Sequence, residues 1–371
     1  MSDLLLQGAP RDGRRAFVRG EITPNGRIGE TQMTRFLRRG GIALVAVAML
    51  APLGGQPSLA AKPMKFIDLD KVPKPKITGA EIIAGLEQFV ADYGMRQSTL
   101  PFDNAATAEF LRDEAKKNGF KSRILELPVD DPVVETVRVV EAIKKGTTKP
   151  NEWITFIAHY DTVEQTLQGA YDDGSGTNMM RFFGKAFSKV KTNRSIALLW
   201  FDAEEQGLLA SQVYAERLKK KGQKIAGAFG FDMVGIGFPA RYCICVYHGP
   251  MPQDAAWAVP IARYVNFDYL KFPEGDGGPG AAAKWPVGTD GHVCICGPNI
   301  RNSDESKFAE QGYLTMRWTG MRTAADYPGY HQPWDTVPFM ELVAGGRDLL
   351  EQGTENTFLS AYYTAFVVDN L

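Results

Sequence analysis

Three predicted strands of this 371-residue chain are each followed by side chains that can bind a metal ion or move a proton. These are His159 and Asp161 after the apolar segment 152–158, Glu204 and Glu205 after 195–201, and Asp232 after 225–231. In open α/β sheets, ligands bind outside the carboxyl ends of the strands. Buried imidazoles and carboxylates are costly unless they are paired or bind a metal. The pattern therefore predicts a divalent-metal site at this edge of a sheet.

Two further segments supply side chains of the same kind. The sequence G-A-Y-D-D-G-S-G at residues 169–176 surrounds Asp172 and Asp173 with glycine and serine. The sequence Y-H-Q-P-W-D-T at residues 330–336 adds a second imidazole, His331. From the residues alone, either of the two aspartates could face a metal ion. Histidines and carboxylates can bind several divalent metals, including zinc, manganese and cobalt.

Six motifs, in order along the chain, resemble the M28 family of zinc metallopeptidases. They are H-Y-D-T at 159–162, G-A-Y-D-D-G-S-G at 169–176, D-A-E-E-Q-G-L-L-A-S at 202–211, F-D-M-V-G at 231–235, S-D-E-S-K-F at 303–308 and Y-H-Q-P-W-D-T at 330–336. The resemblance extends from about Gly79 to the C-terminus. One motif departs from the family, in which His commonly follows S-D where this chain has Glu305.

The resemblance implies a site with two zinc ions. One ion would be held by His159 and Asp232, and the other by Glu205 and His331. The family register assigns Asp172, the first aspartate of D-D-G-S-G, as the bridge between them. A bridging carboxylate sets the spacing of the two ions and offsets their charge.

The same resemblance implies roles for three residues that do not bind metal. Glu204 would be the general base that takes a proton from the metal-bridging water and passes it to the leaving amine. Asp161 would hydrogen-bond His159 and fix its tautomer. Tyr330 would support the oxyanion, as it does in some members of the family.

Strands and helices alternate along the mature chain. Strands are expected at 121–127, 133–144, 152–158, 195–201, 225–231, 242–247, 293–296 and 314–318, and helices at 80–93, 105–118, 178–190, 205–220, 251–265, 306–312 and 351–368. This alternation predicts an α/β three-layer sandwich with a mostly parallel, mixed central sheet and helices on both faces. The resemblance to the M28 family implies the zinc-peptidase form of this sandwich, which is similar to the phosphorylase/hydrolase type.

The N-terminal region has the features of an export signal. A basic segment, 34–39, precedes an apolar run, 42–53, which is too short to span a bilayer. We expect cleavage near Ala60 and a periplasmic or secreted protein with no stable membrane span. An uncleaved anchor is the alternative, and Met33 is an alternative start. The predicted organisation is therefore a signal-bearing extension at 1–60, an extended lead-in at 61–78 and one catalytic domain at 79–371.

Four cysteines form two C-x-C pairs, Cys243 with Cys245 and Cys294 with Cys296. On a strand, both sulfurs of such a pair lie on one face. One disulfide between the two strands is possible in an oxidising compartment. Burial as small apolar side chains is equally open. The spacing matches the usual zinc motifs poorly.

The net charge of −1 gives no indication of nucleic-acid binding.

The resemblance implies an exported aminopeptidase that acts on peptides with a free N-terminus. A glutaminyl-peptide cyclotransferase on the same scaffold is the alternative. Those relatives tend to carry Ser after the bridging-type Asp, where this chain has Asp173. A non-catalytic peptide-binding relative is a third alternative, although such chains usually lose a ligand or the base. Side-chain preference is expected to depend on the Gly- and Pro-rich segment 273–291, and the sequence does not indicate the oligomeric state.

Overall fold

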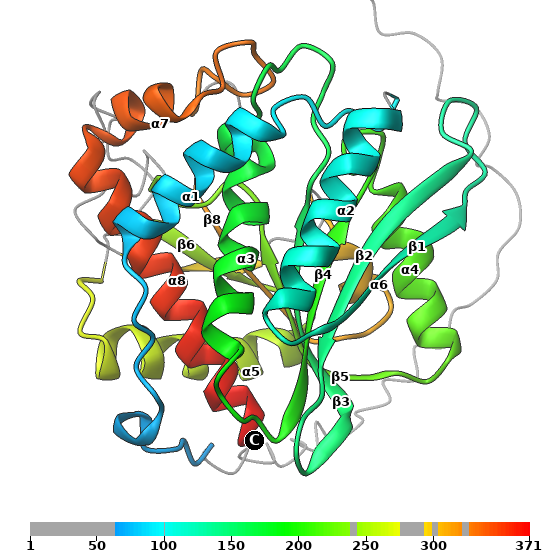
Figure 1. Ribbon diagram of the computed structural model, residues 1–371. Helices are drawn as coiled ribbons and strands as arrows, with labels where there is room; N and C mark the ends of the chain where they lie inside the picture. Colours follow the sequence, from blue (N-terminus) through cyan, green and yellow to red (C-terminus); the bar gives the residue numbers. More distant parts are fainter. Residues whose placement is uncertain (1–63, 100, 238–242, 275–292, 299–302, 321–325) are drawn as a thin grey trace, which may run out of the picture. The chain divides into compact units, whose positions relative to one another are not determined.

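Strands and helices of the chain form three layers around one mixed sheet (Figure 1). This computed structural model describes residues 64–99, 101–237, 243–274, 293–298, 303–320 and 326–371. The predicted signal region at 1–60 and most of the segment 273–291 lie outside the described residues. The predicted α/β fold class is confirmed.

Eight strands in the described part of the chain make up the sheet. They are β1 (Lys121–Pro128), β2 (Thr136–Lys144), β3 (Lys149–His159), β4 (Arg194–Phe201), β5 (Lys224–Phe231), β6 (Ile244–His248), β7 (Val293–Pro298) and β8 (Thr315–Thr319). Their order is β1-β2-β4-β3-β5-β8-β6-β7. The central strands β4, β3, β5 and β8 are parallel, while β2 and β6 run antiparallel to their neighbours β4 and β8.

Helices cover both faces of the sheet. They are α1 (Gly79–Asp92), α2 (Pro101–Lys117), α3 (Ser175–Phe187), α4 (Leu209–Lys220), α5 (Pro252–Arg263), α6 (Glu305–Glu310), α7 (Val337–Ala344) and α8 (Arg347–Asp369), with short turns η1 (Leu69–Lys71), η2 (Ala170–Gly174) and η3 (Tyr264–Tyr269). The larger core contains buried residues of α1, α2, α3, α5 and α8. A second core on the opposite face contains those of α4 and α6.

Strand β3 is central because its apolar side chains serve both cores. Phe156 points into the larger core, and its neighbour Ile157 into the second one. Both are fully buried, and each such side chain contributes roughly 1.5–3 kcal/mol. This double burial explains the near-continuous apolar run in the sequence. In the parallel register with β4, His159 pairs with Phe201, so it lies at the carboxyl edge of the sheet.

Several predicted element boundaries are corrected. The helix predicted at 205–220 begins only at Leu209, because Gly207 and Leu208 both adopt positive φ angles, 108° and 64°, that a helix does not accommodate. The strand predicted from residue 133 begins at Thr136, and the closing helix begins at Arg347. Helix α7 was not predicted from the sequence.

The cysteines form two disulfides, where the sequence had left open one disulfide, burial as small apolar side chains or a zinc site. Cys243 bonds to Cys294 and Cys245 to Cys296, with Cα–Cα distances of 5.7 and 5.5 Å. The C-x-C spacing presents both sulfurs of each strand to one face, and β6 and β7 are direct neighbours. Both pairs are therefore within bonding reach, and the zinc alternative is excluded for these thiols.

The segment Lys62–Leu371 clusters as one unit. Within it, the lead-in before α1 packs onto the core through Leu69, Val72 and Ile77. The domain boundaries at residues 60 and 78 remain predictions. In the described part of the chain, no helix is long and apolar enough to cross a bilayer.

Candidate metal centre

The carboxylate of Asp172 lies between two imidazoles. Its Oδ1 is 3.4 Å from Nε2 of His159, and its Oδ2 is 3.2 Å from Nε2 of His331. His159 ends β3, whereas His331 comes from the loop after β8, so the two rings approach from separate parts of the chain. Asp172 lies in η2, directly before α3. One carboxylate thus faces two nitrogen ligands with different oxygens, as a bridge between two ions requires.

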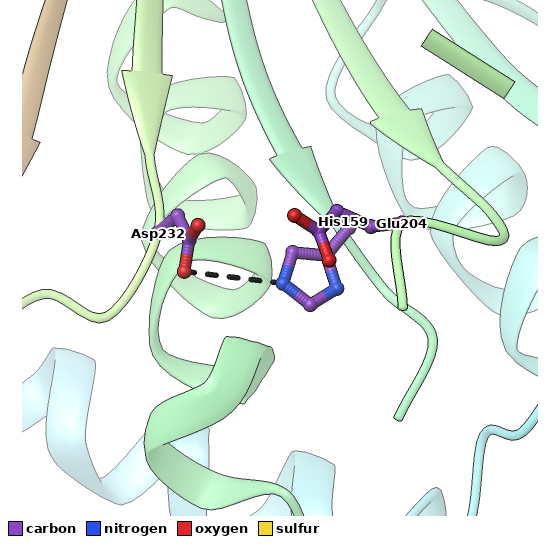
Figure 2. A group of neighbouring side chains, drawn as sticks. All are labelled: His159, Glu204 and Asp232. Carbon is purple, nitrogen blue, oxygen red and sulfur yellow. Dashed lines mark ion pairs between the residues drawn. The ribbon is translucent and has the colours of Figure 1, made fainter. Parts of the chain in front are cut away.

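The other predicted ligands complete two adjacent groups. Glu205 Oε2 is 3.1 Å from His331 Nε2, and Asp232 Oδ1 is 3.9 Å from His159 Nε2. Figure 2 shows His159, Glu204 and Asp232 converging from the ends of neighbouring strands. Potential ligand atoms of these three residues lie within 4.8 Å of one another. The structure therefore brings together all five predicted metal ligands and also places Glu204 at the same centre.

Several atoms in this cluster have no hydrogen-bond partner. Asp232 Oδ1 and Glu205 Oε1 are buried without a hydrogen-bond partner, and His331 Nε2 makes no hydrogen bond of good geometry to the carboxylates beside it. An unsatisfied buried polar atom costs about 1–3 kcal/mol. A metal ion bound to these nitrogen and oxygen atoms would remove this cost. Zinc binds both imidazole nitrogens and carboxylate oxygens. The residues present fit a metal centre.

The pKa values in the cluster are strongly shifted. Burial, together with the nearby Asp172, raises the pKa of Glu205 to about 7, although His331 opposes this shift. Burial also raises the pKa of Glu204 well above its usual range, although His159 opposes this shift. For His331, burial disfavours the charged ring, but Asp172 and Glu205 outweigh it and raise the pKa to about 10. The same two imidazoles lower the pKa of Asp172 against the effect of its burial.

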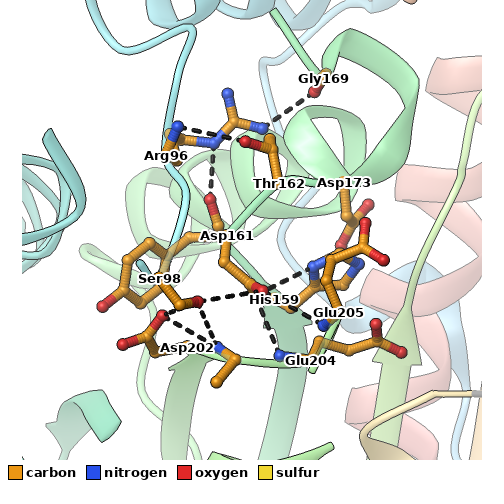
Figure 3. Close-up of polar contacts among 12 residues, drawn as sticks. Arg96, Ser98, His159, Asp161, Thr162, Gly169, Asp173, Asp202, Glu204 and Glu205 are labelled. Carbon is orange, nitrogen blue, oxygen red and sulfur yellow. Dashed lines mark hydrogen bonds and ion pairs between the residues drawn. The ribbon is translucent and has the colours of Figure 1, made fainter. Parts of the chain in front are cut away.

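Asp161 holds the turn that carries the two glutamates. Its Oδ1 accepts a hydrogen bond from the Glu204 backbone N–H, and its Oδ2 accepts one from Glu205, each at 3.2 Å (Figure 3). Its Oδ1 also lies 3.3 Å from His159 Nδ1, a nitrogen that has no hydrogen bond of good geometry. The sequence suggested the contact with His159 but did not indicate the contacts with the glutamate backbone.

A hydroxyl group connects Asp161 to a second buried carboxylate. The Ser98 hydroxyl lies 2.6 Å from Asp202 Oδ1 and 3.3 Å from Asp161 Oδ2, and it accepts a bond from the Ala203 N–H (Figure 3). Asn104 also donates to Asp202. Asp202 therefore braces the turn after β4.

Arg96 fixes the backbone around the site. Its guanidinium is fully buried and donates to the carbonyls of Tyr160, Gln168 and Gly169, at 2.6, 2.7 and 2.9 Å. Figure 3 shows it above the His159–Asp161 segment. It thereby joins the end of β3 to the loop that leads to Asp172. No sequence motif marked this residue.

Asp173 and Asp335 have structural contacts around Asp172. Asp173 Oδ1 accepts from the N–H groups of Gly176 and Met233, at 2.9 and 3.2 Å. Asp335 accepts the Asp172 N–H with one oxygen, at 3.1 Å. Asp172 is thus the aspartate of the pair that faces the imidazoles, and Asp335 braces its backbone.

Three non-glycine residues at the centre have left-handed backbones. Ala203 (φ 54°) precedes Glu204, Met233 (φ 58°) follows Asp232, and His331 itself has φ 56°. Such conformations cost of order 1–3 kcal/mol each and cluster at functional sites. Each changes the direction of the backbone at or next to a candidate site residue.

Tyr330 stacks on the imidazole of His331, with ring centroids 3.8 Å apart and an angle of 20° between the planes. Its side chain is partly buried beside the cluster. Neighbouring carboxylates add to the effect of burial and raise the pKa of its phenol. The tyrosine therefore lies at the site, and its predicted oxyanion contact remains a prediction.

Comparison with known proteins adds to this geometry. Residues 138–272 match the sequence profile described as Peptidase family M28. The matched M28 segment contains six of the eight predicted site residues: His159, Asp161, Asp172, Glu204, Glu205 and Asp232. Tyr330 and His331 lie beyond the matched segment.

A curated relative that this chain resembles is Aminopeptidase YwaD of Bacillus subtilis (strain 168), 28% identical over 207 residues. The match covers 55% of this chain and 40% of the relative. The leading curated relatives are matched over 62% of their length or less.

Solved structures share the fold of this chain. The zinc aminopeptidase BSAP of Bacillus subtilis aligns with a TM-score of 0.61 at 14% identity, over 78% of this chain and 96% of that one. A glutaminyl cyclase of Bacteroides thetaiotaomicron aligns with a TM-score of 0.59 at 15% identity, over 78% of this chain and 99% of that one. At these identities the likeness concerns the fold alone.

Proposed function

We propose that this protein is an exported dizinc aminopeptidase that hydrolyses the N-terminal peptide bond of peptides. The observation that carries the proposal is the position of Asp172, with one oxygen toward His159 and the other toward His331. A single-metal site would not need a carboxylate that faces two separate imidazoles. Asp232 would complete the ion at His159, and Glu205 the ion at His331.

Zinc ions held by these residues would polarise the scissile carbonyl and activate water. Glu204 would be the general base, because its carboxyl group reaches the centre while its backbone is held by Asp161. A carboxyl group with a raised pKa accepts a proton readily from the attacking water and can deliver it to the leaving amine. Acidic groups at the centre would also attract the positively charged N-terminus of the substrate. Tyr330 would support the developing oxyanion.

Two observations support the remaining parts of the proposal. The disulfides between β6 and β7 are typical of proteins that fold in oxidising compartments, which supports export. The M28 match and the relative named as an aminopeptidase support the reaction class.

The alternative is a glutaminyl cyclase, because one solved structure of similar fold is a glutaminyl cyclase. The pair of imidazoles around Asp172 favours two metals and hence the peptidase. Two measurements on the purified protein separate the candidates: zinc content per chain, and turnover of aminoacyl nitroanilides against cyclisation of Gln-peptides. Two ions with nitroanilide hydrolysis support the proposal. One ion with cyclisation would overturn it.

A further inference from the structure

A buried arginine lies directly beneath one of the proposed metal ligands. Arg317, in the middle of β8, has a side chain that is only 2% exposed. Its Nη2 lies 2.8 Å from Oδ2 of Asp232, and its Nη1 lies 3.7 Å from Oε1 of Glu305. The guanidinium therefore sits between two buried carboxylates, with the closer contact to Asp232.

The pairing of strands explains how this arginine reaches Asp232. Arg317 is the register partner of Gly230 in β5, two residues before Asp232. A side chain at Gly230 would collide with Glu305, because a Cβ there would lie 2.6 Å from Glu305 Oε2. The glycine thus leaves the space that Glu305 occupies. Glu305 is also the residue at which the S-D-E motif departs from the expected pattern.

The contact makes the two oxygens of Asp232 different. Oδ2 accepts the bond from Arg317, whereas Oδ1 faces His159 Nε2 at 3.9 Å and has no hydrogen-bond partner. The Thr319 hydroxyl additionally donates to the backbone carbonyl of Asp232, at 2.7 Å. Asp232 is therefore held at its side chain and at its backbone, with one oxygen left for an ion.

We propose that Arg317 is a positioning residue of the metal centre, which makes Asp232 a one-oxygen ligand and offsets its negative charge. The inference rests on the proposed metal site but goes beyond it, because Arg317 is not among the predicted ligands or catalytic residues. Partners of ligating carboxylates typically contribute 10–100-fold to metal affinity. A fork-shaped guanidinium is suited to this contact, and a lysine ammonium is not.

The test measures zinc affinity by competition with a chromophoric chelator, using the full chain loaded with two ions. Arg317→Met keeps the bulk of the stem and removes the charge. We expect the ion at His159 and Asp232 to bind about 10–100-fold more weakly, and the ion at Glu205 and His331 to change less than threefold. Arg317→Lys should recover only part of the loss.

Arg194→Met is the matched control. Arg194 is also a buried arginine paired with a glutamate, Glu152, but it lies at the opposite end of the parallel strands. Its replacement should lower thermal stability and leave both zinc affinities unchanged. If Arg317→Met does not fold, Arg317→Met combined with Glu305→Gln removes both charges and should show the same selective loss.

The outcomes separate the inference from the proposed function. A wild-type protein that binds no zinc would overturn both. Two ions in the wild type, with affinities that Arg317→Met leaves within threefold or weakens equally, would overturn the inference alone. If the wild type binds a single ion, the dizinc proposal fails, and the inference then requires that Arg317→Met weakens that ion.

Discussion

Oδ2 of Asp172 lies 3.2 Å from Nε2 of His331, although the two residues are 159 positions apart in the chain (331 minus 172). The other oxygen of Asp172 faces His159. If Asp172 bridges two ions, replacing it should affect both, whereas replacing either imidazole should affect mainly one.

We therefore expect Asp172→Asn to weaken the binding of both zinc ions, and His331→Gln to release one ion and retain the other. Metal analysis after dialysis, together with chelator competition, measures both effects. The exposed Asp348, in the first turn of α8, offers a control, since Asp348→Asn should retain both ions. Full metal content in Asp172→Asn would exclude the bridging role.

Glu204→Gln should reduce turnover of an aminoacyl nitroanilide by about 10²–10⁴-fold, because an amide cannot accept the proton of the attacking water. Zinc content should stay at the wild-type level, since the amide keeps the shape of the side chain. Glu216→Gln, on the exposed face of α4, is the matched control and should leave the rate unchanged. A Glu204→Gln protein with wild-type kcat would remove Glu204 from the base role.

The metal-free protein should lose stability as the pH rises. Burial raises the pKa values of Glu205, Asp304 and Asp335 to about 7, whereas carboxyl groups in unfolded chains titrate near pH 4. The folded state then holds more protons between about pH 4 and 7, so unfolding becomes easier through that window. His331, with a pKa of about 10 against about 6.5 when unfolded, extends the loss to higher pH.

Thermal denaturation from pH 5 to 9, with and without zinc, measures this effect. The midpoint of the chelator-treated protein should fall across the range. Because zinc displaces the protons of its ligands Glu205 and His331, it should raise the midpoint more at pH 8 than at pH 5. His331→Gln should flatten only the upper part of the curve. Greater stability of the metal-free protein at pH 8 than at pH 5 would contradict the raised pKa values of these buried groups.

The two disulfides close nearly the same loop, because both join β6 to β7 across a sequence separation of 51 residues. Removing one pair, as in Cys243→Ser with Cys294→Ser, should therefore cost little beyond local packing. Removing both should cost about 2–4 kcal/mol, the usual contribution of such a crosslink. Denaturant unfolding of the two variants measures the difference. Equal, large losses in each single-pair variant would show that the bridges act independently.

The sequence alone determined the fold class and the edge of the sheet where the candidate site lies. Apolar runs that alternate with helical segments imply a covered parallel sheet, and the residue after such a run must lie at its carboxyl end. His159, Glu204, Glu205 and Asp232 could be placed by this local rule. The C-x-C pairs likewise presented their sulfurs to one face, although their pairing into two disulfides was not predicted.

Tertiary structure alone decided which side chains meet. Asp172 and Asp173 are adjacent and chemically identical, and only the packed loop turns the first toward the imidazoles and the second toward backbone N–H groups. The 2.8 Å contact between Arg317 and Asp232 depends on β8 lying beside β5. Local sequence patterns indicate the conformation of a single segment. Contacts between distant segments depend on how the whole sheet and its loops pack.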